Sequence, residues 1–428
     1  MTRTWSGLAV LIYILVLTLF SFGVRIYRFT EPNHMYFDEV YHVVTAEAYA
    51  QNNPKAYDPF APAPKKDTAF DWLHPPLAKL IQAGSIKLIG DTPAGWRLPG
   101  VIFGTALIPA TFLLALLLFG KRTAVFAATV IAFENLTLVM SRITMNDVFV
   151  TFFIVLSFIF CKLYIDKHRL RWILLTSISL GLAAGSKWTG FYAIIAIFSF
   201  LFLLGIKQKK FEPKIFLVLL IPPICYLLSY SQFWLQGHSV TDFVNLHKQI
   251  WWYQNRHDLQ HSYGTTPVYC VPQGLSGPRQ WCPWVLDVRG VYFSYEPYGT
   301  DKAGYIYLLG NPIVFWIGII AVCYMLGKLT DRPKKEQLLV LLGYFIFWVP
   351  WIFSPRIMFL YHYLPSIPFM AVIIGYFLKD IYKTKFKYVS FVLLALIIIT
   401  FFYFYPITTG YPIPIAAIDK YMWLKTWR

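Results

Sequence analysis

Apolar stretches of similar length recur along the whole chain and are separated by polar connections. The first, GLAVLIYILVLTLFSFGV at residues 7–24, lacks a small-residue cleavage site, so we interpret it as a retained span and not as a signal peptide. Because a helix needs roughly 20 apolar residues to cross a bilayer core, the pattern predicts eleven membrane-spanning helices. The other ten cover 99–119, 123–140, 146–165, 172–186, 188–206, 214–233, 307–327, 338–353, 357–378 and 388–405.

Composition and charge support an all-α polytopic membrane protein. Hydrophobic residues make up 57% of the chain and charged residues only 14%, far from the balance of a soluble domain. Lys and Arg concentrate in five connections, which all fall on one side if the N-terminus is cytoplasmic and the spans number eleven. The positive-inside rule makes that side the cytoplasm and predicts a multi-pass protein of the cell membrane. The net charge of +17 then comes mostly from the basic connections on the cytoplasmic side. The chain has no basic stripe of the kind that would indicate nucleic-acid binding. The basic connections are 121–122, 166–171, 207–214, 328–335 and 379–387.

Two long segments, 25–98 and 234–306, remain on the outer side. The first contains HPPLAKLIQAGSIKLIG, where two prolines suit a helix start and apolar residues recur at helical spacing, so we expect a helix lying on the membrane surface. The second is dense in Trp, Tyr, His, Gly and Pro, which favours ordered loops and short helices resting on the bilayer. The chain thus divides into an N-terminal transmembrane catalytic region (1–233), an outer loop (234–306) and a C-terminal four-span region (307–428).

Two cysteines of the second outer loop are candidates for a disulfide. Cys270 and Cys282 enclose CVPQGLSGPRQWC, and an oxidising compartment would permit them to pair. Twelve residues of separation do not fix the geometry that a bridge needs, so free thiols are an equal alternative. Neither these cysteines nor the histidines of the loop follow a metal-ligand spacing, and we expect no metal.

Asp38 and Glu39 stand side by side in MYFDEVYH, just outside the first span. One interpretation is that Asp38 caps a short helix through VYHVVTAEAYAQ, since Asp accepts hydrogen bonds from free amides at a helix start. The other is that the pair supplies a general base, because partly apolar surroundings and a second carboxylate raise a carboxyl pKa toward the working range. The position outside the membrane strengthens the second interpretation.

Cations at the outer boundary indicate a bound anion. Arg97, Lys187 and Arg356 each sit beside a short turn, where a single cation could simply reach toward the headgroups. Together they occupy the side on which positive charge is disfavoured, and a lipid phosphate is the anion available there. Further polar residues of SRITMND lie at the same level and could complete the pocket, although Asp147 could also cap its helix. These are Arg142, Asn146 and Asp147.

The motifs, in this order, resemble those of the protein O-mannosyltransferases that use polyprenyl-phosphate-linked mannose. These enzymes are multispanning glycosyltransferases with lipid-phosphate donors, and the resemblance covers nearly the whole chain. It rests on the early acidic pair, the HPPL-K motif, the arginine that opens the second span, the SR...ND and KW-G turns, and an arginine followed by HYLP. The matching residues are Asp38, Glu39, His74, Lys79, Arg97, Ser141, Arg142, Asn146, Asp147, Lys187, Trp188, Arg356, His362 and Tyr363.

The resemblance implies an eleven-span fold with its active site at the outer membrane surface. It implies inverting transfer of mannose from a polyprenyl phosphate to Ser or Thr hydroxyls of translocated proteins, with the lipid-linked sugar as co-substrate and no cofactor. The expected partners are the donor, acceptor proteins, membrane lipids and the secretion machinery. On this basis Asp38 is the base and Glu39 orients it or balances charge. The phosphate side is assigned to Arg97, Lys187 and Arg356, with His362 and Tyr363 as hydrogen-bonding support.

The chain departs from the family pattern in its second outer loop. His261 and Tyr263, expected on the acceptor side, are separated from the tryptophan-rich segment by the two cysteines. The loop is also too short for the soluble domain of eukaryotic members, which favours a prokaryotic type. Another sugar or a glycolipid acceptor remains an alternative within the same architecture. A lipid-linked sugar transporter is a further alternative. The charges argue against it, because they gather at the membrane boundary and not in the middle of the spans.

Overall fold

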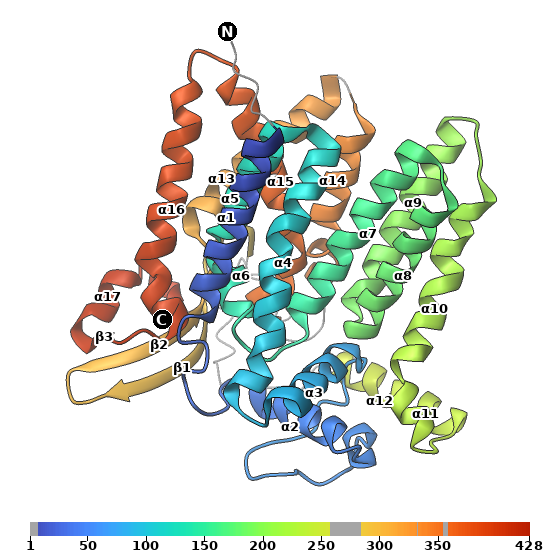
Figure 1. Ribbon diagram of the computed structural model, residues 1–428, viewed down its shortest axis with the longest axis vertical. Helices are drawn as coiled ribbons and strands as arrows, with labels where there is room; N and C mark the ends of the chain where they lie inside the picture. Colours follow the sequence, from blue (N-terminus) through green and yellow to red (C-terminus); the bar gives the residue numbers. More distant parts are fainter. Residues whose placement is uncertain (1–6, 257–283, 332, 354–357) are drawn as a thin grey trace, which may run out of the picture.

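The computed structural model describes residues 7–256, 284–331, 333–353 and 358–428. Long helices lie side by side and form a bundle with two distinct ends (Figure 1). Within the described residues, eight helical segments are long and apolar enough to cross a membrane. They are Gly7–Ile26 (α1), Pro93–Phe119 (α4), Asp147–Lys167 (α7), Thr189–Lys207 (α9), Pro312–Asp331 (α13), Lys335–Phe353 (with α14, Lys335–Phe345), Leu360–Tyr382 (with α15, Ile367–Tyr382) and Lys387–Thr409 (α16).

The other three predicted spans are shorter or broken helices. Leu170–Ser186 (α8) and Leu217–Ser229 (α10) are uninterrupted, whereas the predicted span 123–140 is split into Lys121–Ala132 (α5) and Asn135–Met140 (α6). The predicted all-α polytopic fold is therefore confirmed.

The break between α5 and α6 is held by buried polar groups. The side chain of Glu134 accepts hydrogen bonds from the backbone N of Leu136 and of Thr137, and so caps α6. It also accepts one from the backbone N of Asn311 at 3.2 Å, while Asn311 Nδ2 donates to the carbonyl of Phe133 at 3.0 Å. These bonds satisfy backbone groups that an interrupted helix would leave unpaired in lipid.

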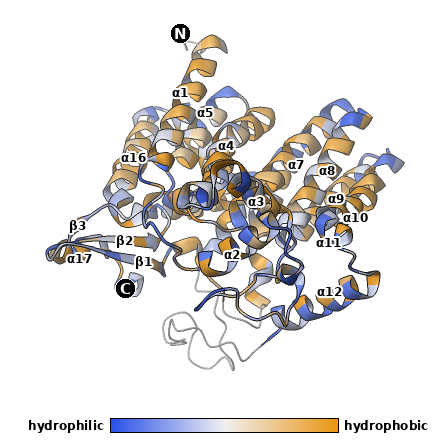
Figure 2. Ribbon diagram, turned by 60° about the horizontal axis from the view of Figure 1, so that its bottom comes forward, coloured by the Kyte–Doolittle hydropathy of each residue, from blue (hydrophilic) through white to orange (hydrophobic). Residues whose placement is uncertain are grey.

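One end of the bundle carries the extramembrane elements. Glu39–Ala50 (α2), Leu77–Ile89 (α3), Ser231–Leu235 (α11) and Val240–Gln254 (α12) gather at the end opposite the N-terminus (Figure 1). Hydrophobic colour dominates the long helices, and hydrophilic colour is frequent around α2 and α12 (Figure 2). The structure thus has a helix at each of the two positions predicted in the first outer segment.

The second outer segment contains a β-hairpin that the sequence analysis did not predict. Val291–Tyr298 (β1) pairs antiparallel with Lys302–Leu308 (β2), and Ile413–Pro414 (β3) adds a short third strand. The prediction of short helices is confirmed for α12 in this segment, but it is wrong over residues 291–308, where the chain forms strands, and α13 begins at Pro312 instead of 307. Alternating aromatic residues of the two strands pack in cross-strand pairs, such as Tyr292 with Tyr307, which favours a strand pair.

Two glycines of α4 bring the turn after α6 close to the first turns of that helix. Gly100 and Gly104 are four residues apart and therefore share one helix face. A Cβ atom at Gly100 would lie 2.9 Å from the Ser141 carbonyl oxygen, and one at Gly104 would overlap the Ser141 side chain. This close approach, typical of small residues between membrane helices, sets the position of residues 141–147.

Candidate active site

A cavity of about 650 Å³ opens at the end of the bundle that carries α2, α3 and α12. Its walls come from the start of α2, the segment before α3, the start of α7, the α8–α9 turn, the end of α12 and residues 350–362. The structure thus brings together five of the predicted site residues: Asp38, His74, Asp147, Lys187 and His362. The cavity therefore combines carboxylates, a lysine and histidines with aromatic walls.

Asp38 lines this cavity from the N-cap position of α2. Its side chain makes no capping hydrogen bond, so the first interpretation, that the carboxylate caps the helix, is wrong. Burial raises the pKa of Asp38 to about 6; Asp71 and Asp147 also raise it, while His42 and Lys187 lower it. A carboxyl group whose pKa lies close to the working pH is suited to act as a general base.

The residue before Asp38 has a backbone conformation that is unusual for its type. Phe37 has φ of 50°, in the left-handed region that large side chains rarely adopt. Its ring stacks on Phe293 of β1 at 4.0 Å and meets the rings of Phe359 and Tyr361 edge-on. A strained backbone conformation of this kind persists only where the packing of the surrounding side chains holds it in place. The aromatic cluster therefore fixes the direction in which Asp38 leaves the backbone.

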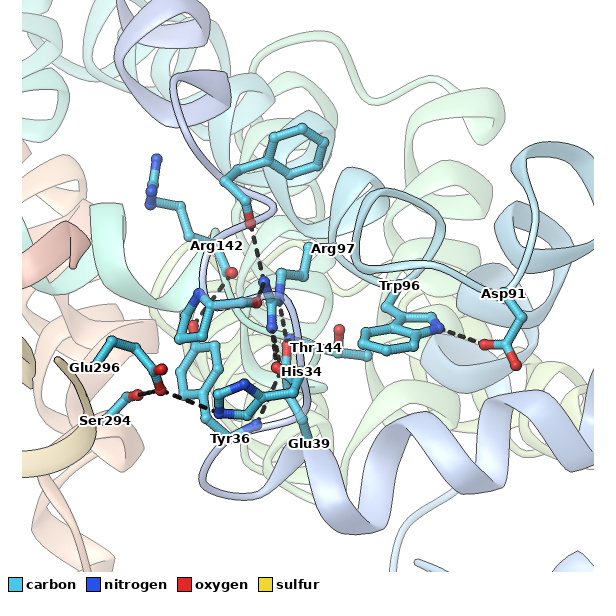
Figure 3. A network of polar contacts seen from close by, with 12 residues as sticks. His34, Tyr36, Glu39, Asp91, Trp96, Arg97, Arg142, Thr144, Ser294 and Glu296 are labelled. Carbon is cyan, nitrogen blue, oxygen red and sulfur yellow. Dashed lines mark hydrogen bonds and ion pairs between the residues drawn. The ribbon is translucent and has the colours of Figure 1, made fainter. Parts of the chain in front are cut away.

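Glu39 and Arg97 form a buried ion pair away from the cavity wall. Arg97 Nε donates to Glu39 Oε1 at 2.9 Å and Nη2 donates to Oε2 at 2.8 Å (Figure 3). The remaining donors of Arg97 go to backbone carbonyls, including that of Pro32 at 2.8 Å, and Glu39 also accepts from the backbone N of Thr144. Neither side chain is among the cavity-lining residues. This placement corrects the predicted phosphate contact of Arg97, because its guanidinium is fully engaged in holding the segment before α2 to α4.

Lys187 is the predicted phosphate-side residue that the cavity does contain. It lies in the turn between α8 and α9, and its Nζ is 2.7 Å from Asp147 Oδ1 at the start of α7. The same ammonium group lies 5.4 Å from the centre of the Tyr361 ring. An aromatic face and a carboxylate thus hold a buried cation at the cavity wall.

Three other predicted residues lie outside the cavity lining. Arg142 donates to carbonyls near the end of α1, including those of Arg25 and Tyr27, both at 2.7 Å. Tyr363 is fully buried and donates to Tyr344 at 2.8 Å, so its predicted support of the phosphate does not match its position. Asn146 is also buried, at the start of α7.

Five predicted residues fall outside the described part of the chain, so their roles and the disulfide stay predictions. They are His261, Tyr263, Cys270, Cys282 and Arg356. In the part that is described, no group of three or more His, Cys, Asp and Glu side chains could hold a metal ion.

The sequence analysis missed two polar residues of the cavity, His42 and Asp71. Asp71 Oδ2 lies 2.8 Å from Lys79 Nζ and 3.0 Å from His42 Nδ1. Burial alone would raise the pKa of Asp71, but Lys79 and the histidines His74 and His42 outweigh it and hold that pKa well below its usual range. Two features of the sequence could have pointed to these residues. His42 lies one helical turn after Asp38, and Asp71 lies just before the HPPL motif.

Many helices long enough to cross a membrane, with a polar cavity at one end of the bundle, are the architecture expected of multispanning glycosyltransferases with lipid-phosphate donors. Two family models match this chain along most of its length. Residues 15–236 match dolichyl-phosphate-mannose-protein mannosyltransferase, and residues 239–427 match the C-terminal four-transmembrane region of protein O-mannosyltransferase. The chain therefore belongs to the protein O-mannosyltransferase family.

Two relatives can be aligned with most of the chain. The polyprenol-phosphate-mannose–protein mannosyltransferase of Corynebacterium glutamicum is 24% identical, over 83% of this chain and 81% of its own length. The protein of the same name from Mycobacterium tuberculosis is 23% identical over the same shares.

Solved structures share the fold. A chain of the Saccharomyces cerevisiae Pmt1–Pmt2 complex bound to the sugar donor has a TM-score of 0.78 at 16% identity, over all of this chain and 93% of that one. ArnT from Cupriavidus metallidurans bound to undecaprenyl phosphate has a TM-score of 0.55 at 13% identity, over 87% of this chain and 61% of that one. The first similarity extends across both halves of the chain.

Proposed function

We propose that this protein transfers mannose from polyprenyl-phosphate-mannose to Ser or Thr hydroxyls of proteins, with inversion at the anomeric carbon. The observation that carries the proposal is the position of Asp38, a carboxylate with a pKa near 6 in the same cavity as Lys187. The family of the chain and the names of its bacterial relatives support the sugar, the lipid phosphate and the protein acceptor.

The reaction needs a base on one side of the anomeric carbon and positive charge on the other. Asp38 takes the proton of the acceptor hydroxyl as its oxygen bonds to the anomeric carbon. The bond from that carbon to the phosphate oxygen breaks, and its electron pair leaves with the phosphate. Lys187 stabilises the developing charge on the phosphate, together with Arg356 as predicted from the sequence.

Glu39 and Arg97 act in this scheme as positioning residues. Glu39 is the first residue of α2 and is fixed by Arg97 of α4 and by the backbone of Thr144. Their bonds hold the start of α2, and therefore Asp38, in place without either side chain reaching the substrate.

We place the cavity on the outer face of the cell membrane, with the N-terminus in the cytoplasm. The basic connections predicted to be cytoplasmic follow helices that run away from the cavity end, such as α7 and α9 (Figure 1). The positive-inside rule then puts the cavity where translocated acceptor proteins arrive from the secretion machinery.

A reconstituted transfer assay tests the proposed function. Purified protein in lipid nanodiscs is given polyprenyl-phosphate-mannose and a Ser/Thr peptide, with the matching Ala peptide as control. We expect a mannosylated peptide only with hydroxyl residues, identified by mass and by release of free polyprenyl phosphate. Parallel reactions offer a glycolipid as the acceptor or a polyprenyl phosphate that carries a different sugar. Transfer in one of these reactions but not from polyprenyl-phosphate-mannose to the Ser/Thr peptide would contradict the proposal.

Replacing Lys187 by Met is expected to weaken donor binding. A charge-assisted hydrogen bond contributes about 1.5–3 kcal/mol, so the KM for the donor should rise roughly tenfold to a hundredfold. Because the single change leaves Asp147 without its partner, the control is the double variant Lys187→Met with Asp147→Asn. We expect the donor KM to stay high in both variants. A donor KM equal to that of the unchanged protein would remove Lys187 from the phosphate site.

The pH dependence of transfer is expected to follow the ionisation of Asp38. The base must be ionised, so kcat/KM should rise about tenfold per pH unit below pH 6 and level off above it. Lys187 lowers the pKa of Asp38, and its replacement by Met should therefore move the midpoint to higher pH. Rates measured in overlapping buffers between pH 4.5 and 8, about the range where such groups titrate, check this. A profile that stays flat through pH 6 would be inconsistent with Asp38 as the base.

A further inference from the structure

We propose that His42 receives from Asp38 the proton that Asp38 has taken from the acceptor hydroxyl, and so returns the base to its active form. This inference rests on the proposed function and assigns a role to a side chain that the reaction described above does not use.

His42 and Asp38 lie one helical turn apart at the start of α2. The backbone N of His42 donates to the backbone carbonyl of Asp38 at 3.1 Å, which closes the first turn of the helix. Residues four apart share a helix face, and both side chains line the same cavity. A proton on the carboxylate of Asp38 is therefore close to an imidazole that opens onto the same space.

A carboxylate and a lysine lie behind the ring of His42. His42 Nδ1 lies 3.0 Å from Asp71 Oδ2, and the same oxygen lies 2.8 Å from Lys79 Nζ. All three side chains are buried, and Asp71 is held in addition by its backbone N, which donates to Thr45. The contact with Asp71 uses Nδ1, which leaves Nε2 as the ring nitrogen that can take a proton. A histidine oriented by a carboxylate is the arrangement in which imidazole accepts protons effectively.

Charged groups from three other segments surround this site. The segment before α3 contributes Asp71 and His74, whose ring is nearly parallel to that of His42 at 6.2 Å. Lys79 comes from α3 and Lys187 from the α8–α9 turn. Asp71 stays ionised because its pKa is well below the usual range, so it remains a negative partner for an imidazolium at His42.

The proton balance has two steps. In the first, the acceptor oxygen bonds to the anomeric carbon, its proton goes to Asp38, and the phosphate leaves with the electron pair. In the second, the proton moves from Asp38 to His42 Nε2 and then to water at the open side of the cavity. Asp38 is again a carboxylate and His42 is again neutral.

The variant His42→Asn separates this role from a structural one. The amide nitrogen of Asn can occupy the position of Nδ1 and keep the contact with Asp71, but the side chain cannot take up a proton. We expect kcat to fall by about a hundredfold, the lower end for proton transfer by a positioned group, with KM values for donor and peptide unchanged. A second variant, His42→Gly, should lose a similar fraction of kcat and regain part of it when free imidazole is added.

The matched control is His168→Asn. His168 also pairs with a carboxylate, with Nδ1 2.8 Å from Glu212 Oε1, but it follows α7 at the end of the bundle away from the cavity. This variant should keep the kcat of the unchanged protein. If His42→Asn has a kcat within about twofold of the unchanged protein, or if imidazole does not raise the kcat of His42→Gly, the relay is excluded. Failure of the unchanged protein to form glycopeptide would instead contradict the proposed function.

Discussion

Replacing Asp38 by Asn is expected to abolish mannosyl transfer while leaving the protein folded. Asn has nearly the same shape as Asp but cannot take a proton from the acceptor hydroxyl. Loss of a positioned base lowers rates by about 10²–10⁴-fold. The side chain of Asp38 makes no capping bond, so the change removes no capping stabilisation from α2. Initial rates with labelled donor, and melting temperature in detergent, measure the two effects separately.

The control for this prediction is Asp67→Asn. Asp67 is an exposed residue of the same outer segment, outside the cavity lining, and its φ of 59° is one that Asn adopts readily. The control should transfer mannose at the rate of the unchanged protein. Near-normal transfer by Asp38→Asn at full expression would rule Asp38 out as the base.

Replacing Glu39 by Ala is expected to destabilise the protein more than any other single change proposed for this chain. The carboxylate and the Arg97 guanidinium are both fully buried, and removal of one partner leaves an uncompensated charge. Breaking a buried pair in this way costs about 3–5 kcal/mol. Thermal unfolding in detergent should show a clear loss for Glu39→Ala and for Arg97→Met. The double variant Glu39→Ala with Arg97→Met should lose less than the sum of the two single changes, because no charge is left unpaired.

An exposed ion pair of the same region serves as the control. His34 Nε2 lies 3.1 Å from Glu296 Oε1, and the side chain of His34 is 58% exposed (Figure 3). Exposed pairs contribute little, so Glu296→Ala should leave the melting temperature nearly unchanged. Strictly additive losses in the Glu39–Arg97 variants would show that the two side chains do not depend on each other.

Most of the fold could be predicted from the sequence because each membrane-spanning helix needs an apolar stretch as long as the bilayer core is thick, and such stretches are visible in the sequence. The β-hairpin was missed because its Tyr-rich strands have the composition of an aromatic interfacial loop. The break after α5 was missed because Glu134 is one polar residue in a long apolar stretch, and its partner Asn311 is distant in sequence. Neither contact leaves a periodic pattern along the chain.

The candidate site could be predicted in part. Asp38, Lys187 and His362 were placed by motifs at the membrane boundary, and the structure brings them to one cavity. Arg97 was assigned to the phosphate because it lies at the same depth, but depth does not determine which way a side chain points. His42 belongs to the cavity through its contact with a segment about thirty residues away, and only the folded chain shows such a contact.

The bonds between Glu134 and Asn311 bear on how the chain is made. During synthesis, α5 and α6 enter the membrane long before Asn311 leaves the ribosome. Until then the carbonyl of Phe133 lacks the amide that later donates to it, and unpaired groups are costly in lipid. A fragment that ends at residue 236, where the first family match stops, should therefore be retained by chaperones or degraded. When the second half of the chain is produced in the same cell, Asn311 can supply the missing hydrogen bonds to this fragment, and the two halves should then pack together.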